Sequence, residues 1–491
     1  IEAQKLAERH NGFQNFQYQE HQRKKKRLIN VVPRCPNTPE YWAKDKKYNP
    51  YYVLKHHKQI SRAIRLKIEK GTYRPNAPLI YGKKKSNGKI RRLSIYQIPD
   101  AAVSNYLYYK LLSKNKHRLS PYAYAYRNDK NVHYAIQDIS IDFRQFDRVF
   151  VAEYDFSDFF GSISHDFLFE QMDENGFSIT QKERALIKTF LPTDGKGIPL
   201  GTSISLFLAN LVCWRLDKQL ELAGIRFARY ADDTIIWSED YSKICRAHSI
   251  ISDFSNSSGV RINYKKSCGI SLLASDDVKS EFSKTKRSIE FLGYEVNNEH
   301  VSIKESSCRR IKEKISYILY QNLIQPLALD MINANNISLP NSIYDPALLV
   351  AISQVRRYLY GDLSDDKIIK YLNNTYKRLE FKGLMSFYPL VNDETQLQQL
   401  DGWLVSVIIK YLKKRYLILE ENELPVPNIP LTSRAGFIEY CSRQIINNKT
   451  QLLKIPSFIR IYQAIKKGIN TQGLSGIINP QNAAYEYESM E

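Results

Sequence analysis

The feature that most constrains this chain is a pair of adjacent aspartates, Asp232 and Asp233, inside an otherwise apolar stretch. Residues 227–230 and 234–237 are rich in aromatic and apolar side chains, which predicts two strands joined by a tight turn. The hairpin would hold two carboxylates side by side at its tip. Their repulsion is tolerated where a divalent cation lies between them. A plain surface turn is the alternative, because Asp favours turns.

A third carboxylate, Asp155, follows an apolar run at residues 148–154 and therefore lies where a predicted strand ends. Two-metal phosphoryl transfer uses carboxylates from separate strands that converge on two cations about 4 Å apart. One cation activates the attacking hydroxyl, and the other stabilises the leaving pyrophosphate. The sequence thus predicts a catalytic and metal-binding site of Asp155, Asp232 and Asp233. It would hold two Mg²⁺ ions, or Mn²⁺, since both suit oxygen ligands.

These carboxylates, with Tyr230 and Ala231 before the pair, resemble the catalytic motifs of reverse transcriptases. Three further blocks resemble that family in the same order: residues 198–205 with Asn210, residues 259–267 and residues 291–294. The resemblance covers residues 76–300 well and residues 301–417 more loosely. It implies an α+β right-hand polymerase with fingers, palm and thumb, and with an antiparallel palm sheet.

The resemblance also implies how the fingers would bind a nucleotide. Residues 76–97 predict a β-hairpin, because Asn87 and Gly88 form a strong turn signal. By resemblance to the family's fingers hairpin, Arg91 or Arg92 would bind the γ-phosphate. Strand alternation places the two arginines on opposite faces, so only one can face the nucleotide. The family's usual sequence context favours Arg92.

Residues just after Asp155 would complete the nucleotide site. The resemblance assigns a metal-binding backbone carbonyl to Phe156, and backbone contacts beneath the triphosphate to Asp158 and Phe159. Phe160 matches the steric-gate position, where a bulky ring would clash with a ribose 2′-hydroxyl and favour dNTPs. The alternative is that Phe160 belongs to the core, because its neighbours are also phenylalanines.

Other blocks add a pocket, a general acid and a primer grip. Leu200 and Gly201 would line the nucleotide pocket. Many family members have Gln where Leu200 stands, and Leu cannot hydrogen-bond, which leaves the checking of sugar and base open. Lys266 would protonate the leaving pyrophosphate as a general acid, with Lys265 as the competing candidate. The primer grip would be Phe291, Leu292, Gly293 and Tyr294.

Composition fits a large globular protein with a polyanionic partner. The chain has 491 residues and a formal charge of +21, from 72 basic and 51 acidic residues.

Five regions are predicted: a basic helical extension (1–75), fingers (76–150), palm (151–300, with a fingers insertion near 176–197), a helical thumb (301–420), and a linker, small helical unit and tail (421–491). Six scattered cysteines without CxxC spacing, and no membrane-length apolar run, favour a cytoplasmic protein without membrane contact. The resemblance implies that the cytoplasm is bacterial.

The sequence therefore predicts an RNA-directed DNA polymerase with an RNA template, a DNA product and dNTPs as partners. The layout resembles bacterial defence-associated (phage-resistance) enzymes, which typically copy a dedicated non-coding RNA. Retron and group II intron enzymes, a template-independent polymerase of the abortive-infection type and a non-catalytic RNA-binding scaffold are the alternatives. Tail residues Tyr485 and Tyr487 could prime synthesis through a phenol hydroxyl. The oligomeric state stays open, with a homo-oligomer among the possibilities.

Overall fold

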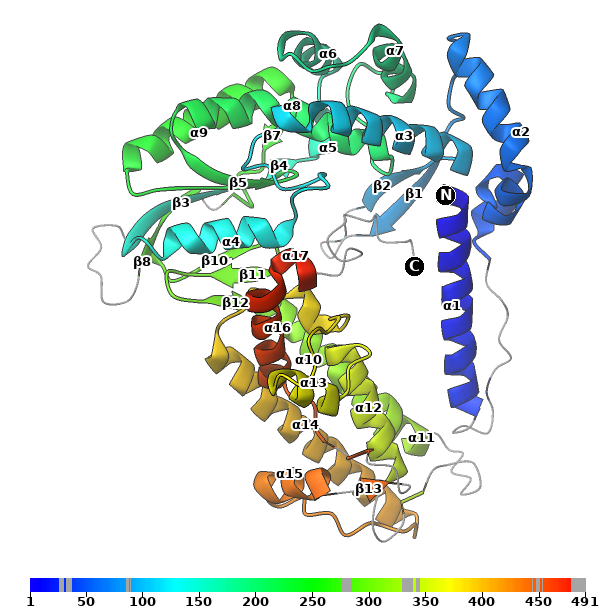
Figure 1. The fold of residues 1–491 in the computed structure, drawn as a ribbon, viewed down its shortest axis with the longest axis vertical. Coiled ribbons are helices and arrows are strands. Elements are labelled where there is room, and N and C mark those ends of the chain that lie inside the picture. The colour runs from blue at the N-terminus through cyan, green and yellow to red at the C-terminus, as the bar shows by residue number, and fades with distance from the viewer. Residues whose placement is uncertain are drawn as a thin grey trace. The chain divides into compact units, whose positions relative to one another are not determined.

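The computed structural model describes residues 1–25, 31, 38–84, 88, 90–267, 269–274, 285–328, 339–340, 345–443, 445–446, 451–452 and 454–477. The chain divides into two compact units (Figure 1). The first holds Ile1–Asn15 and Cys35–Ser288, and the second holds Phe16–Arg34 and Ile289–Ala483. Across the described part of the chain, every helix is too short or too polar to span a membrane.

The first unit is built on a five-stranded sheet in the order β5-β6-β3-β8-β9. Its pairs are antiparallel except β8 with β9. The strands are β3 (Arg148–Tyr154), β5 (Arg226–Tyr230), β6 (Asp233–Ser238), β8 (Gly269–Ala274) and β9 (Thr285–Lys286). Helices α8 (Ser203–Leu222) and α9 (Tyr241–Ser258) lie on one face and α4 (Val132–Phe143) on the other (Figure 1). Residues 204–213 of α8 are all buried, which makes this helix the centre of the core.

Shorter elements surround this sheet. Strands β1 (Leu79–Lys84) and β2 (Ile90–Ile95) form the predicted fingers hairpin, although Asn87 of its turn lies outside the described residues. Strands β4 (Phe156–Ser157) and β7 (Arg261–Ile262) pair beside the end of β3. The helices of this unit are α2 (Pro50–Glu69), α3 (Ile98–Asn115), α5 (Phe159–Ser162), α6 (His165–Glu174) and α7 (Gln181–Phe190). Helix α1 (Glu2–Lys25) is divided between the two units after Asn15.

The second unit joins a small sheet to a set of helices. Strands β10 (Ile289–Phe291), β11 (Tyr294–Val296) and β12 (Val301–Ile303) form an antiparallel meander. The helices are α10 (Glu305–Leu319), α11 (Gln325–Ala328), α12 (Pro346–Tyr360), α13 (Asp365–Leu372), α14 (Glu394–Glu421), α15 (Arg434–Arg443), α16 (Phe458–Gln472) and α17 (Leu474–Ile477). A short strand pair, β13 (Ile445–Ile446) with β14 (Gln451–Leu452), follows α15.

The division into two compact units is coarser than the five predicted regions, which stay a prediction. Strands β10–β12 group with the helices of the second unit, although the sequence placed the end of the palm at residue 300. Helix α16 belongs to that unit as well. The reason is a cap: the Asp401 carboxylate of α14 accepts hydrogen bonds from the Ser457 hydroxyl at 2.6 Å and from the Phe458 amide at 2.6 Å.

Two glycines in the second unit give a test of its packing. A Cβ on Gly383 would lie 2.2 Å from the Leu359 carbonyl oxygen and 2.4 Å from the Gly361 nitrogen. Gly402 lies inside α14, where an added Cβ meets nothing within 4 Å. We expect Gly383→Ala to destabilise the protein by about 1–3 kcal/mol through overpacking. Gly402→Ala should stabilise it by about 0.5–1 kcal/mol through helix propensity.

Urea unfolding followed by circular dichroism would measure both changes as shifts in the transition midpoint. The two variants add the same methyl group, so opposite shifts isolate the close backbone approach at Gly383. A Gly383→Ala midpoint equal to that of the parent protein would contradict this packing.

Candidate active site

The aspartate pair lies at the tip of the predicted hairpin. Strands β5 and β6 pair up to Tyr230 and Asp233, which leaves Ala231 and Asp232 as a two-residue turn. Ala231 has a φ of 61°, the positive value that primed hairpin turns require at their first central position. Asp232 is half-buried and Asp233 is exposed. The two carboxylates therefore occupy different environments despite being adjacent in the chain.

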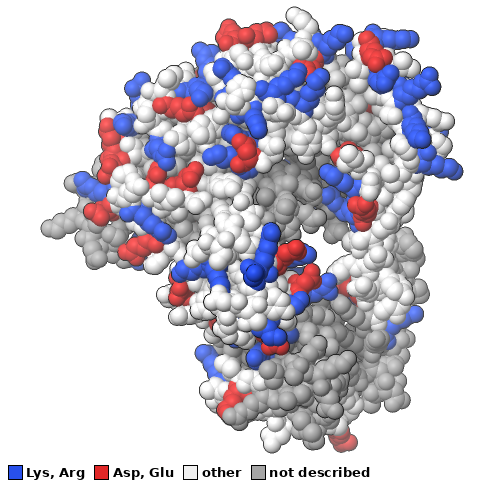
Figure 2. Space-filling model, in the orientation of Figure 1, with Lys and Arg blue, Asp and Glu red and all other residues white. Residues whose placement is uncertain are grey.

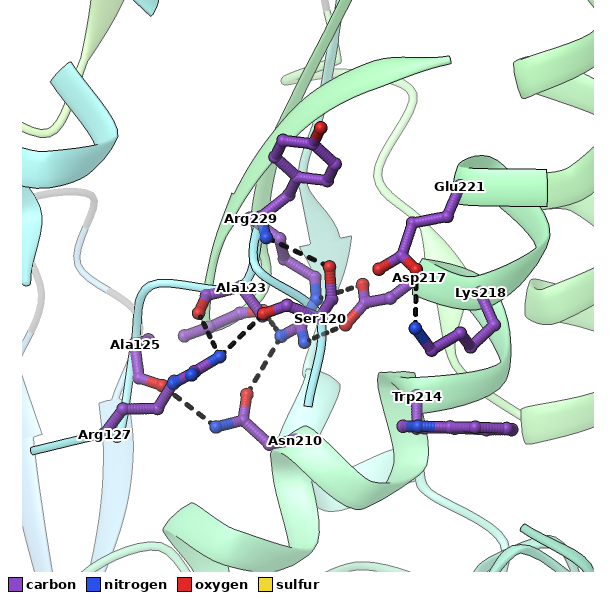
Figure 3. A network of polar contacts seen from close by, with 12 residues as sticks. Ser120, Ala123, Ala125, Arg127, Asn210, Trp214, Asp217, Lys218, Glu221 and Arg229 are labelled. Carbon is purple, nitrogen blue, oxygen red and sulfur yellow. Dashed lines mark hydrogen bonds and ion pairs between the residues drawn. The ribbon is translucent and has the colours of Figure 1, made fainter. Parts of the chain in front are cut away.

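A buried arginine fastens this turn to helix α8 (Figure 3). Arg229 is 1% exposed and binds the Asp217 carboxylate through two hydrogen bonds, Nε–Oδ1 at 2.7 Å and Nη2–Oδ2 at 2.6 Å. Its Nη1 donates to the Ala231 carbonyl at 3.0 Å, which holds the backbone of the turn. Desolvation lowers the pKa of Arg229 and the Asp217 charge raises it, with a net rise, so the guanidinium stays charged.

The same network positions the segment that runs beside β5. The Arg229 amide donates to the Tyr122 carbonyl, and the Tyr124 amide donates to the Arg229 carbonyl, both at 2.9 Å. Asn210 of α8 accepts from Arg229 Nη1 at 3.3 Å and donates to the Ala125 carbonyl at 2.9 Å (Figure 3). The buried amide of Asn210, which belongs to one of the blocks that resemble reverse transcriptases, thus supports the turn that carries Asp232.

Sequence reasoning did not identify Arg229 and Asp217. The available signal was an Asp inside an almost continuous apolar helix and an Arg inside an apolar strand. Buried charges are rare unless they are paired, so two such residues in neighbouring apolar segments indicate an ion pair.

Asp155 is held from one side by the segment that follows β7. Its carboxylate accepts from Asn263 Nδ2 at 2.8 Å and from Lys266 Nζ at 2.9 Å. The backbone reinforces this contact, because the Asn263 amide donates to the Asp155 carbonyl at 2.8 Å and the Asp155 amide donates to the Ser267 hydroxyl at 3.2 Å. Lys266, predicted as a general acid, is thus ion-paired with the first catalytic carboxylate.

Asp155 and Asp232 are electrostatic neighbours. Burial raises the pKa of the Asp232 carboxyl, and the charge of Asp155 raises it further, while Arg91 and Lys266 act in the opposite direction. Carboxylates that repel one another in this way fit a divalent cation, whose charge would offset the repulsion. Within the described residues, no cluster of three or more His, Cys, Asp or Glu side chains is arranged to hold a metal.

Arg91 of the fingers hairpin acts electrostatically on Asp232, and its charge lowers the pKa of the Asp232 carboxyl. Both arginines are exposed on β2, where Arg91 pairs with Lys83 and Arg92 with Gly82. Of these two cations, Arg91 is the one whose charge lowers the pKa of Asp232. The sequence could not decide between them, because alternation separates the two faces without saying which face meets the palm.

The predicted pocket loop is in direct contact with β2. The Ser94 amide donates to the Leu200 carbonyl at 2.7 Å. Gly201 has a φ of 114°, and a Cβ there would lie 2.6 Å from the Ser94 carbonyl oxygen. Glycine is therefore required at position 201 both by the backbone conformation and by the close approach of the fingers strand.

The residues after Asp155 form a tight turn. Asp158 is exposed and has a left-handed backbone, with a φ of 46°. The ring of Phe159 is buried in the core, whereas that of Phe160 is only partly buried. The Phe160 ring lies edge-on to Phe159 at 5.4 Å and to Tyr126 at 6.5 Å between centroids. The Phe160 carbonyl accepts from the Ile198 amide at 2.7 Å, which fixes its backbone.

The predicted primer grip lies in the second unit. Leu292 and Gly293, with φ of 51° and 87°, form the turn between β10 and β11. The rings of Phe291 and Tyr294 are buried, and the Tyr294 hydroxyl donates to the Phe387 carbonyl at 3.1 Å. Leu292 and Gly293 are thus the more accessible part of this block. Tyr485 and Tyr487 lie outside the described residues.

Comparison with known proteins shows what the part of the chain that carries this geometry is similar to. Residues 82–296 match the family model of "Reverse transcriptase (RNA-dependent DNA polymerase)". The chain is also 25% identical over 173 residues to the Retron Ec86 reverse transcriptase of Escherichia coli, which covers 34% of this chain and 49% of that protein. The chain thus spans about half the length of that curated relative. The fold is a right-hand polymerase fold with a helical C-terminal region, as predicted.

Solved structures of telomerases are also similar to this chain. A telomerase from Candida albicans, in complex with a telomeric RNA fragment, is 12% identical and has a TM-score of 0.38, covering 74% of this chain and 66% of that one. An apo telomerase from Candida tropicalis is 11% identical with a TM-score of 0.38, covering 85% and 68%.

The buried ion pair beneath the turn predicts a large loss of stability on substitution. Asp217→Asn removes the charge that compensates Arg229, which is fully buried, and should cost about 3–5 kcal/mol of unfolding free energy. Asp173→Asn is the matched control, because the Asp173–Arg184 pair is equally short at 2.7 Å but exposed. It should cost less than about 1 kcal/mol. Thermal unfolding compares the two, and equal midpoints would contradict the structural role of Asp217.

Proposed function

We propose that this protein is an RNA-directed DNA polymerase that synthesises DNA by metal-assisted phosphoryl transfer. The observation that carries the proposal is that residues 82–296 match the reverse transcriptase family model and hold Asp155 and Asp232, of which the first raises the pKa of the second through its charge. The family generally uses divalent metal ions. A non-catalytic scaffold would have no need to keep two repelling carboxylates together next to Lys266 and Arg91.

The carboxylates of Asp155 and Asp232 would hold the divalent ions, with the Phe156 carbonyl as a further oxygen donor and Asp233 at the edge of the site. Such ions, when bound, activate the attacking 3′-hydroxyl and stabilise the leaving pyrophosphate. Mg²⁺ and Mn²⁺ both suit this donor set. Lys266 lies within reach of the same carboxylates, where its ammonium can donate a proton to the leaving group.

Other residues would bind and select the substrates. Arg91 would bind the triphosphate, because its charge already reaches the catalytic turn. The turn at Asp158 and Phe159 would present backbone amides to the phosphates, next to the pocket loop of Leu200 and Gly201. The partly buried ring of Phe160 would exclude a ribose 2′-hydroxyl and so favour dNTPs. Residues 291–294 would position the primer end.

Removing either central carboxylate should abolish synthesis without unfolding the protein. We expect Asp155→Asn and Asp232→Asn to lower the rate of dNTP incorporation on a primed RNA template below detection, because each substitution removes a ligand charge. Asp233→Asn should also impair synthesis, but less than Asp232→Asn, because Asp233 is exposed whereas Asp232 is half-buried. Primer extension, read on denaturing gels, measures all three.

Asp194→Asn is the control, because Asp194 is an exposed carboxylate in the loop before α8. Omission of the RNA template separates templated copying from untemplated addition. Full synthesis by Asp155→Asn or Asp232→Asn would refute the metal assignment, and undiminished synthesis without template would refute RNA-directed copying.

The two arginines of β2 provide a second test. We expect Arg91→Ala to raise the KM for dNTPs about 10- to 100-fold, the usual loss for a charge-assisted contact with a phosphate. Arg92→Ala removes the same side-chain atoms and the same charge from the neighbouring position. It should alter the KM for dNTPs only a few-fold. Steady-state primer extension over a range of dNTP concentrations measures both. A larger effect of Arg92→Ala would assign the triphosphate contact to the other face of β2.

The finer biological setting is also part of this proposal. The single-chain layout with a basic N-terminal region and added C-terminal helices favours a bacterial cytoplasmic enzyme that copies a dedicated non-coding RNA in antiphage defence. The match to a retron enzyme keeps a retron-type role as the second candidate. Priming from Tyr485 or Tyr487 stays an alternative, and it predicts DNA that remains attached to protein in denaturant.

A further inference from the structure

Helix α2 carries a straight row of cations that the proposed polymerase site does not use. At 100° per residue, four exposed basic residues at spacings i, i+3, i+7 and i+10 fall within an arc of about 80°. They extend for about 15 Å along the helix. We call this row the α2 stripe: Lys55, Lys58, Arg62 and Arg65. In Figure 2, blue side chains run over the part of the molecule where Figure 1 places α2.

The opposite face of α2 is committed to the core of the first unit. Val53 is buried together with Ala3 and Ile98, and Ile60 packs against the same cluster. Ile64 packs against the main core. The apolar face that an amphipathic helix would insert into a membrane is therefore already covered by protein. The face of α2 that remains available to a partner is therefore the positively charged one.

The stripe has little compensation from acidic residues. Helix α2 contains five Lys and Arg residues and a single acidic residue, Glu69. Glu69 forms a 3.1 Å pair with Arg65, but both side chains are largely exposed, so the pair contributes little and leaves the arginine accessible. A row of four closely spaced cations with a single exposed acidic neighbour fits a regularly charged polyanion.

We propose that the α2 stripe binds the phosphate backbone of RNA outside the polymerase site, without reading its sequence. Its length covers several consecutive phosphates of a strand, and lysine and arginine side chains can contact them without base-specific contacts. The choice of RNA as the polyanion rests on the proposed function. The stripe would then add affinity for a template or for a structured part of it, while selection of nucleotides stays with the palm and fingers.

The test compares two charge-matched double variants of the full-length protein. Lys58→Gln with Arg62→Gln removes two charges from the stripe. Lys67→Gln with Lys70→Gln removes two exposed charges at the end of the same helix, about 100° or more from the centre of the stripe. Gln has a helix propensity close to that of Lys and Arg, so both variants should keep α2 folded. Circular dichroism confirms this before binding is measured.

Binding is measured by fluorescence anisotropy with a fluorescein-labelled RNA hairpin of mixed sequence, without dNTPs, over a series of KCl concentrations. We expect the stripe variant to weaken binding on the order of tenfold near physiological salt, and to reduce the slope of log K against log [KCl] by about 1.5. The control variant should lose only a few-fold. Equal losses and equal slopes in the two variants would overturn the proposal.

Two further arms separate this inference from its rivals and from the proposed function. Vesicles of phosphatidylcholine with about one-third phosphatidylserine test a membrane partner. Stripe-dependent binding to these vesicles in place of RNA would overturn the proposal. Primer extension by the parent protein is the second arm, and it tests the proposed function separately from RNA binding. If the parent protein makes no DNA and the stripe still binds RNA, only the proposed function fails.

Discussion

The buried Arg229–Asp217 pair is the interaction on which the Ala231–Asp232 turn, the predicted catalytic turn, depends. An uncompensated guanidinium in the core would be strongly unfavourable, so Arg229 must stay close to Asp217. Because α8 carries Asp217 in its buried part, the position of this helix determines where β5 ends. The remaining Nη1 hydrogen then reaches the Ala231 carbonyl and holds the backbone on which Asp232 is presented. The Arg229–Asp217 ion pair thus links the packing of helix α8 to the position of the Asp232 carboxylate.

The other side of the site is organised by hydrogen bonds instead of a buried charge. Asp155 receives one bond from Asn263 and one from Lys266, and its backbone is bonded to the same segment. Opposite it, the fingers strand is joined to the pocket loop at Ser94 and Leu200. Asp232 is therefore influenced from two directions, by Lys266 of the palm and by Arg91 of the fingers. Both cations reduce the cost of keeping two carboxylates close together.

The sequence was sufficient for features that depend on local pattern. The Asp232–Asp233 hairpin, the strand ending before Asp155 and the fingers hairpin were predicted because apolar runs and turn residues specify them directly. Sequence context favoured Arg92 over Arg91, but that choice depends on which face of β2 meets the palm, and a local pattern does not contain this information. The roles of Asn210 and Asp217 also depend on tertiary contacts, in which residues 12 to 85 positions apart meet around Arg229 and Ala125.

Charge has opposite roles at the catalytic turn and on helix α2. Around Asp155 and Asp232, basic side chains lie next to carboxylates, so their charges largely cancel and act on local geometry. On α2 the basic side chains face outward in a row, and the one acidic residue of the helix pairs with its last member. At moderate salt, interactions between exposed charges are largely screened beyond about 8–10 Å. The row therefore interacts mainly with charged groups that lie in direct contact with it. The functional meaning of the net charge of +21 therefore depends on the positions of the basic side chains that have no acidic side chain close by.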